Sequence, residues 1–342
     1  MYPCGSRGPV WAPACAGAHR ILAPDTTRIT RFAADLDALT SPGENVGVAV
    51  SGGPDSLALL LLAAAARPRL VAAASVDHGL REGSRNEAEA VGRLCEQLGI
   101  PHDILTIEWE VQPASALQEQ ARNARYRALG TWAKTRGLAA VATGHHADDQ
   151  AETLVMRLVR GAGVRGLAAM RAVAPLPGST GVSLLRPLLG WRRAELAAVV
   201  AAAGIEAADD PSNHDERHER VRVRQRLAES AWLDPVQLAN SSGHLAAADA
   251  AIEWAVEREM AAVRSEAAAL YYCPGDAPPE IRRRVAARIV AMLASEGDGE
   301  ALRGRELDRL LAALDEGRSA TLRGVQATGG PEWHFRTAPP RR

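Results

Sequence analysis

The segment Ser51-Gly52-Gly53-Pro54-Asp55-Ser56 brings together residue types that can bind phosphate. A β-branched apolar run ends at Val50, just before it, and a Leu/Ala-rich run of helical character follows. Neighbouring glycines let a backbone approach a ligand closely, and the unpaired N–H groups at a helix start attract anions. The serine hydroxyls add donors, whereas a carboxylate such as Asp55 suits a phosphate only with a cation beside it. We therefore expect all six residues to bind a nucleotide phosphate, with Asp55 as the Mg²⁺ ligand.

Segment 51–56 has two alternative interpretations, an ordinary strand-to-helix turn and a lysine P-loop. An ordinary strand-to-helix turn would also use glycine for its conformation and serine as the helix N-cap, but here serine, glycine and aspartate all have uses at a phosphate at once. A lysine P-loop needs a lysine after its glycines, and Lys134 is the only lysine in the chain. The segment resembles instead the PP-loop of enzymes that split ATP into AMP and pyrophosphate.

Two further polar clusters follow predicted strands. Asp77 comes directly after the predicted strand 70–76, and Gly144, His145 and Asp149 follow the predicted strand 138–143. Ligands of open α/β sheets bind at the carboxyl ends of the strands. All three clusters should therefore lie on one rim of the sheet, with Asp77 and Gly144 close to the nucleotide.

The pattern leaves the roles of these residues open. Asp77 could contact the adenosine half of a nucleotide, or it could cap the next turn. His145 and the acidic residues after it could hold Mg²⁺, orient a substrate or move a proton, or the acids could be partners of a helix dipole. We favour a functional role for the cluster after residue 143, because it is the third polar group predicted on one rim.

Hydrophobic periodicity predicts alternating strands and helices over residues 28–228, which is typical of a doubly wound, mostly parallel α/β sheet. Helical periods dominate the rest of the chain, and β segments at 321–327 and 332–336 could form a small terminal hairpin. We expect an ATP-binding catalytic domain over 28–228 and a smaller, mainly helical domain over 229–342. Residues 1–27 show no clear periodicity and are interpreted as a disordered tail or an over-called start.

Arginine supplies all but one of the 40 basic residues, while the net charge is −1. Any RNA contact must therefore use local patches rather than a global attraction. One patch is the glycine-rich loop 160–167, and another is an arginine-rich run after residue 213 that could be a helix face or a strand edge. The residues that we expect to contact RNA are Arg160, Arg165, Arg217, Arg220, Arg222 and Arg224.

Two other predicted helices carry arginine. The helix 115–132 places Arg122, Arg125 and Tyr126 on one face, which we expect to be exposed. The helix 281–293 carries several arginines that we expect to be solvated. Basic faces of this kind are more often solvated than functional, so neither assigns a role without further support.

Composition narrows the class of protein. The 4 cysteines are widely separated and form no C-x-x-C pair, so neither a zinc site nor a disulfide framework is indicated. The longest apolar stretch, residues 57–66, is about half of the ~20 residues that a membrane-spanning helix needs. We expect a cytoplasmic protein that does not bind a membrane.

Several motifs over about residues 45–227 resemble, in order, those of the bacterial tRNA(Ile)-lysidine synthetase family of PP-loop enzymes. They are S-G-G-P-D-S at 51–56, D-H-G-L-R at 77–81, R-N-A-R-Y-R at 122–127, G-H-H-A-D-D-Q-A-E-T at 144–153, R-G-A-G-V-R-G-L at 160–167, R-P-L-L at 186–189 and D-P-S-N at 210–213. The first motif is shared by many PP-loop enzymes, whereas the histidine-aspartate motif joined to the glycine-rich loop is much more specific.

The resemblance implies a two-step reaction. ATP would adenylate the C2 oxygen of the wobble cytidine in a tRNA(Ile) with a CAU anticodon, and free L-lysine would then displace AMP. The lysidine formed changes the codon read from AUG to AUA. The implied partners are this tRNA and lysine, the implied cofactors are ATP and Mg²⁺, and a homodimer is one option for assembly.

The resemblance also implies that the helical domain over 229–342 binds tRNA, and it implies residue roles. Asp77 would lie beside the adenosine, and Arg122, His145 and Asp149 would act near the cytidine and the lysine. Together with Asp55, the last three are the candidate catalytic residues.

Three rival functions share part of this pattern. A PP-loop enzyme that thiolates tRNA would need cysteines to carry sulfur or bind an iron–sulfur cluster, and none is placed on the predicted rim. A metal-dependent phosphoesterase would use the histidines and aspartates as metal ligands but would leave segment 51–56 without a purpose. A nucleotide-sensing RNA-binding protein would bind ATP without converting it to AMP and pyrophosphate.

Overall fold

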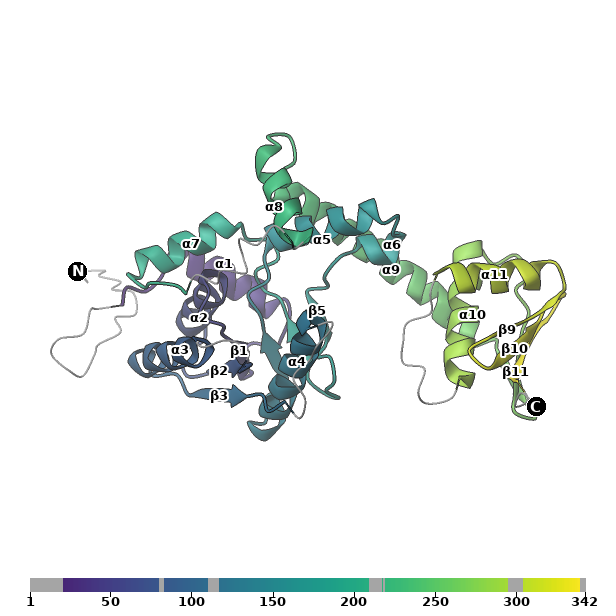
Figure 1. Ribbon diagram of the computed structural model, residues 1–342, viewed down its shortest axis with the longest axis horizontal. Helices are drawn as coiled ribbons and strands as arrows, with labels where there is room; N and C mark the ends of the chain where they lie inside the picture. The colour runs from purple at the N-terminus through teal and green to yellow at the C-terminus, as the bar shows by residue number, and fades with distance from the viewer. Residues whose placement is uncertain are drawn as a thin grey trace, which may run out of the picture. The chain divides into compact units, whose positions relative to one another are not determined.

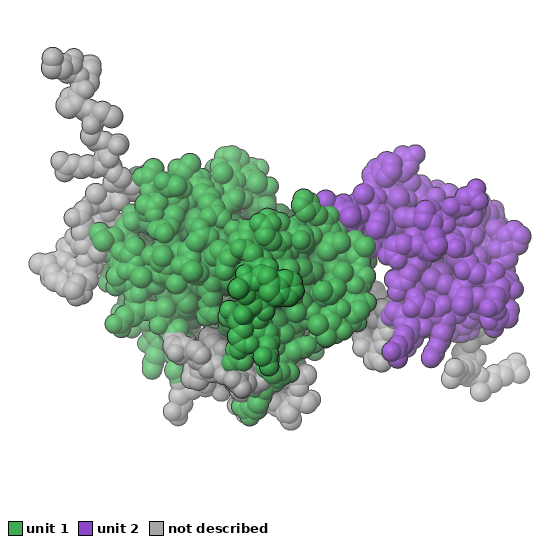
Figure 2. Space-filling model, turned by 90° about the horizontal axis from the view of Figure 1, so that it is seen from above, with its two compact units in different colours: residues 1–246 green, residues 247–342 purple. Residues whose placement is uncertain are grey.

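The computed structural model describes residues 21–79, 83–109, 117–208, 217, 219–294 and 304–338. The chain divides into two compact units, residues 1–246 and 247–342 (Figure 2). Helix α9 (Pro235–Met260) contributes to both units, so the domain boundary expected at residue 228 lies before this helix. Most of the predicted tail 1–27 and the turn at 210–213 fall outside the described residues.

The first unit is built on a six-stranded sheet with the order β3-β2-β1-β4-β6-β5 (Figure 1). Neighbouring strands are parallel except for the edge pair β5 and β6. The strands are β1 (Val46–Ala49), β2 (Val71–Asp77), β3 (His102–Thr106), β4 (Ala140–Ala142), β5 (Val173–Pro175) and β6 (Ser183–Leu185). The predicted mostly parallel α/β sheet is therefore confirmed.

Helices cover both faces of this sheet. Helix α2 (Pro54–Ala66) is apolar all round, and its buried residues pack between the sheet and the helices α1 (Thr26–Asp37) and α7 (Arg193–Ala202). Helix α3 (Ser84–Leu98) lies against β2 and β3. Helix α4 (Leu117–Thr135) buries its apolar residues in a separate cluster on the other face of the sheet. The sheet thus forms the middle of three layers.

Two local expectations for this unit need correction. The edge strand β5 was not predicted, because three residues of which two are exposed leave no periodic signal. Tyr126 is only 2 % exposed and belongs to the cluster beneath α4, so the face it shares with Arg122 and Arg125 is not simply a solvated one.

The second unit joins a five-stranded antiparallel sheet, with the order β7-β8-β11-β10-β9, to helices α10 (Pro279–Leu293) and α11 (Gly304–Asp315). Its strands are β7 (Arg264–Glu266), β8 (Ala269–Tyr272), β9 (Ser319–Leu322), β10 (Val325–Thr328) and β11 (Trp333–Thr337). The terminal hairpin is present within this larger sheet. The segment 321–327 is two strands rather than one, because Arg323 and Gly324 turn the chain with φ angles of 47° and 69°.

The arginines of α10 are not simply solvated, contrary to expectation. Arg284 is 7 % exposed and bonds Asp249, Glu253 and Glu280 at 2.6 to 2.7 Å. Arg288 pairs with Glu253 as well. Periodicity could not show this, because the acidic partners Asp249 and Glu253 come from α9, about 30 residues earlier in the chain.

Candidate active site

The three predicted polar clusters lie on one rim of the first sheet. Strand β1 pairs in parallel with β2 on one side and with β4 on the other. Segment 51–56 follows β1, Asp77 ends β2 and Gly144 follows β4, so all three stand at adjacent carboxyl ends. The structure therefore brings together the residues that the sequence placed at one nucleotide site.

Segment 51–56 forms a compact loop around the Ser56 hydroxyl. The Ser51 N–H donates to Ser56 Oγ at 3.1 Å, and Ser56 Oγ donates to the Gly53 carbonyl at 2.9 Å. Gly52 has a φ of +85°, which side-chain-bearing residues rarely adopt, and its carbonyl accepts from Ala208 N–H at 3.0 Å. Pro54 begins α2, where a missing N–H costs nothing.

Gly144 packs directly on the start of α2. A Cβ built on Gly144 would lie 2.9 Å from the Asp55 carbonyl oxygen and 3.1 Å from the Ser56 nitrogen. Since real Cβ atoms do not approach backbone so closely, only glycine lets the loop after β4 reach segment 51–56. Gly144 thus holds the two halves of the site in register.

His146 lies between three carboxylates at the start of α5 (Ala147–Val159). Its Nε2 is 3.5 Å from Asp55 Oδ2 and 3.5 Å from Asp149 Oδ2, and its Nδ1 is 3.5 Å from Asp148 Oδ2. Burial opposes the charged imidazolium, but Asp148, Asp55 and Asp149 outweigh it and raise the pKa of His146 to about 10. His146 was not among the predicted site residues, although it stands inside the polar run 144–153.

Asp55 has a carboxylate oxygen that no described residue binds. Its Oδ1 is buried and has no hydrogen-bond partner among the described residues. Buried carboxylate oxygens are normally bonded, and Mg²⁺ is commonly held by one or two carboxylates together with phosphate oxygens. The donor set here fits a Mg²⁺ ion that ATP brings with it, with Asp55 as the protein ligand.

His145 lies on the opposite side of β4 from Asp55, toward β6, and it is surrounded by positive charge. The Thr143 Oγ1 is 2.9 Å from His145 Nδ1. Desolvation, together with the charges of Arg186, Arg125 and Arg122, lowers the pKa of His145 well below its usual value. The imidazole is therefore neutral at physiological pH and able to accept a proton.

Arg122 lies over the ring of Tyr126. The guanidinium carbon of Arg122 is 5.2 Å from the centre of the Tyr126 ring, and that of Arg125 is 5.9 Å from it. Such cation–π contacts orient guanidinium groups without neutralising them. Both arginines remain able to bind an anion near His145.

Asp77 organises the turn that follows β2. Its Oδ1 accepts from the Gly79 N–H at 3.0 Å and from the Ser84 hydroxyl. The Ser84 hydrogen bond is the main reason that the pKa of Asp77 lies below its usual value. The structure shows that Asp77 caps the turn after β2. Its contact with the adenosine half of a nucleotide stays a prediction.

Two of the six predicted RNA-contacting arginines bind a buried carboxylate. Arg224 Nε donates to Glu152 Oε1 at 2.6 Å, and Arg220 Nε lies 3.2 Å from Glu152 Oε2. Both arginines belong to α8 (Glu219–Glu229), so the arginine-rich run is a helix and not a strand edge. Burial raises the pKa of Glu152 and Arg224 opposes that rise.

The other four predicted arginines lie nearer the surface. Arg160 pairs with Glu219 at the start of α8, and Arg165 is exposed in the short helix α6 (Val164–Leu167). Arg222 donates to the Arg217 carbonyl at 3.1 Å. The glycine-rich loop that carries Arg160 and Arg165 is held by Arg157, which donates to the Gly166 carbonyl at 2.7 Å.

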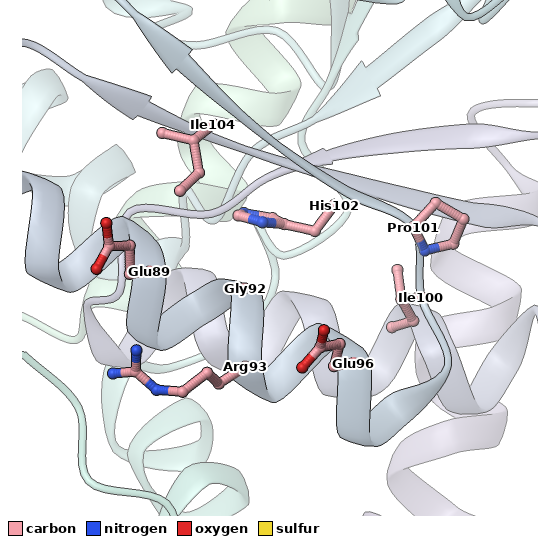
Figure 3. A pocket seen from close by; sticks show the side chains of 8 residues that line it. All are labelled: Glu89, Gly92, Arg93, Glu96, Ile100, Pro101, His102 and Ile104. Carbon is pink, nitrogen blue, oxygen red and sulfur yellow. The ribbon is translucent and has the colours of Figure 1, made fainter.

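A separate cavity of about 580 Å³ lies between α3 and β3 (Figure 3). Its lining includes Glu89, Arg93 and Glu96 from α3 and His102 from β3. No predicted site residue lines it, and the mixed charges of its walls select no ligand class. Within the described residues, no helix is both long and apolar enough to cross a membrane.

Known structures share the fold of the first unit. The model of a family described as the PP-loop domain matches residues 24–231. The U34-tRNA thiolase NcsA from Methanococcus maripaludis, solved with its [4Fe-4S] cluster, superposes with a TM-score of 0.53 at 18% identity, covering 64% of this chain and 80% of that one. This likeness concerns the fold alone.

Curated relatives match almost the whole chain. A tRNA(Ile)-lysidine synthase from Novosphingobium aromaticivorans is 50% identical over 92% of this chain and 94% of its own length. One from Zymomonas mobilis is 41% identical over 89% of this chain and 92% of its own length. These matches, together with a PP-loop rim whose motifs stand in the order of that family, show that the chain belongs to the tRNA(Ile)-lysidine synthase family of PP-loop enzymes.

Proposed function

We propose that this protein uses ATP to join free L-lysine to C2 of the wobble cytidine in a tRNA(Ile) with a CAU anticodon. The observation that carries the proposal is the match, over more than nine-tenths of both chains, with a lysidine synthase that is 50% identical. The geometry agrees with this reaction, because a phosphate loop, a candidate Mg²⁺ ligand and an arginine cluster stand on one rim.

The first step is adenylation of the tRNA. The C2 oxygen of cytidine attacks the α-phosphorus of ATP, a phosphorus–oxygen bond forms, and pyrophosphate leaves with the electron pair of the bond that breaks. Ser51, Gly52, Gly53 and Ser56 hold the phosphates with backbone N–H and hydroxyl groups at the start of α2. Asp55 would hold Mg²⁺, which would supply charge neutralisation at the pyrophosphate.

In the second step the lysine side-chain amine attacks C2. The carbon–nitrogen bond forms while the carbon–oxygen bond breaks, and AMP departs with that oxygen. The amine must be neutral before it attacks, and we assign the removal of its proton to His145, whose lowered pKa keeps the imidazole neutral. We assign to Asp149 the pairing with the incoming ammonium, and to Arg122 the binding of the nucleotide or the amino acid.

The predicted RNA-contacting arginines divide into two groups. Arg160, Arg165, Arg217 and Arg222 present guanidinium groups that suit the phosphates of a folded RNA. Arg220 and Arg224 act through Glu152, by fixing α8 against α5. We also propose a cytoplasmic location and that a homodimer is the assembly to test first.

Thiolation is the second candidate, because the structural neighbour is a tRNA thiolase. The described cysteines do not favour it. Burial raises the pKa of the Cys95 thiol to about 12, which disfavours the thiolate, and Cys273 lies in the second unit. Cys4 and Cys15 lie outside the described residues.

The deciding experiment incubates purified protein with tRNA(Ile), ATP and labelled L-lysine. We expect lysine-labelled tRNA together with stoichiometric AMP and pyrophosphate. Modification that depends on sulfide, without lysine incorporation, would overturn the proposal in favour of thiolation. AMP formation that does not require tRNA would refute the proposed order of adenylation.

A further inference from the structure

Arg186 differs from the other deeply buried arginines of this protein. Within the described residues, Arg67, Arg186 and Arg284 are the arginines with the least exposed side chains, at 5 %, 7 % and 7 %. Arg67 is paired with Asp37, and Arg284 is paired with Asp249 and two glutamates. Arg186 has no carboxylate partner among the described residues.

The bonds that Arg186 does make leave its charge uncompensated. Its Nη1 donates to the Arg171 carbonyl at 2.6 Å and its side chain is also hydrogen-bonded to the uncharged Tyr126, whereas its buried Nε has no hydrogen-bond partner in the described part of the chain. A buried charge without a counter-charge is costly and normally marks a place where a ligand completes the pairing. An anion is the group that this position lacks.

The neighbours of Arg186 strengthen that requirement. Arg186 directly follows β6, level with Thr143, which directly follows β4 and whose N–H donates to the Leu185 carbonyl at 3.0 Å. Burial, with the added charges of Arg186, Arg125 and Arg122, lowers the pKa of His145 and keeps it neutral. A neutral histidine does not offset positive charge, so three guanidinium groups share a region to which the described residues supply no carboxylate counter-ion.

The order of the strands indicates which substrate supplies the anion. Asp77 follows β2 and segment 51–56 follows β1, whereas Arg186 follows β6, beyond β4 on the other side of β1. If the nucleoside and the phosphates of ATP occupy the ends of β2 and β1, Arg186 lies where lysine or the tRNA, rather than ATP, would bind.

We infer that Arg186, with Arg122 and Arg125, binds a singly charged oxyanion of one of the two substrates other than ATP. This inference rests on the proposed function, which offers two sources for such an oxyanion. One is the α-carboxylate of free lysine, and the other is a phosphodiester next to the wobble nucleotide. Both accept the bidentate hydrogen bonds that a guanidinium provides.

The test compares Arg186→Gln and Arg186→Lys with the unaltered protein. We expect Arg186→Gln to raise either the KM for lysine or the Kd for tRNA(Ile) by at least about tenfold, as losing a charged hydrogen bond would do, and Arg186→Lys to recover part of that loss. The Kd for ATP should stay unchanged in both variants. The constant that changes identifies the source of the oxyanion.

Arg67→Gln is the matched control, because it removes a buried arginine at the opposite end of α2. It should lower thermal stability and leave the KM for lysine and the Kd for tRNA unaltered. If Arg186→Gln behaves in the same way, Arg186 only supports the Arg171 carbonyl and the inference is wrong.

A second measurement covers the case in which the Arg186 variants do not fold. Binding of L-lysine is compared with that of cadaverine, which lacks the carboxylate, and an anticodon stem-loop is compared with one carrying a methylphosphonate beside the wobble nucleotide. One probe that carries the oxyanion must bind more tightly than its counterpart that lacks it, and equal affinities in both pairs overturn the inference. Because these are binding measurements, a failure to incorporate lysine would count against the proposed function alone.

Discussion

Glu152 of α5 and Arg224 of α8 form an ion pair that holds these two helices together beside the site. The Arg224 Nε donates to Glu152 Oε1 at 2.6 Å, and the Glu152 side chain is 2 % exposed. Arg220 donates to the neighbouring Thr153 hydroxyl at 3.1 Å, so two arginines of α8 grip the same turn of α5. The arginine-rich run therefore does structural as well as electrostatic work.

Replacing Arg224 by alanine should destabilise the protein. Glu152 would remain buried with Arg220 as its remaining ion-pair partner, and we expect a loss of about 1–3 kcal/mol, less than for a fully buried pair because Arg224 is partly exposed. Urea denaturation measures this loss. Arg226→Ala, at a position with an 83 % exposed side chain, is the control and should change the unfolding free energy by less than about 0.5 kcal/mol. Unchanged stability with weaker tRNA binding would show that Arg224 contacts RNA instead.

Asp55→Ala should abolish adenylation and leave tRNA binding almost unaltered. The substitution removes the proposed Mg²⁺ ligand and, with it, charge stabilisation of the departing pyrophosphate, so AMP formation should fall by at least about a hundredfold. The unfolding free energy should fall only modestly, because Asp55 Oδ1 makes no hydrogen bond in the described structure and His146, which loses its contact with Asp55 Oδ2, keeps Asp148 and Asp149 as partners. Undiminished AMP formation by the variant would refute the role assigned to Asp55.

Gly144→Ala should impair both folding and the first chemical step. The added methyl group would lie 2.9 Å from the Asp55 carbonyl oxygen, so the loop after β4 or the start of α2 must move. Gly243 in α9 provides the control, since a Cβ there meets nothing within 4 Å and alanine is the better helix former by about 1 kcal/mol. Melting temperatures and AMP formation should fall for Gly144→Ala only, and equal behaviour of both variants would contradict the close packing at Gly144.

Stability should decline in mild acid partly through His102. This side chain contacts the Ser75 hydroxyl at 2.9 Å, and burial lowers its pKa below 6.5 despite the opposing charge of Asp103. The unfolded chain therefore binds more protons than the folded one as the pH falls below about 6.5, so the stabilisation present above that pH is lost toward lower pH. In His102→Gln the difference between unfolding free energies at pH 8 and pH 5 should shrink; an identical difference would exclude this histidine as a cause.

Arginine substitutions on the outer surface should alter the salt dependence of tRNA binding. Arg165→Ala and Arg222→Ala should each weaken binding and reduce the slope of log K against log salt by roughly one, as expected for the loss of one phosphate contact. Arg69→Asn tests an exposed arginine at the opposite edge of the sheet, and asparagine tolerates the φ of 68° found there. An unaltered slope in the first two variants would mean that these arginines are merely solvated.

Much of the site followed from local sequence, for a physical reason. The type of each element depends on periodicity and on turn residues within a few positions, and parallel strands align their carboxyl ends on one rim. The sequence therefore predicts that segment 51–56, Asp77 and the run after Gly144 lie together, and the parallel pairing of β1 with β2 and β4 confirms it.

Only the tertiary structure decided which of those polar residues bind one another. His146 lies among three carboxylates, and Glu152 pairs with two arginines from a helix about 70 residues away. Arg186 is buried and has no carboxylate partner among the described residues. Burial and charge pairing depend on segments that are distant in the chain, which periodicity cannot register. The sequence by itself thus determined which strand ends carry the polar residues of the candidate site. Packing decided which of their charges are paired with one another.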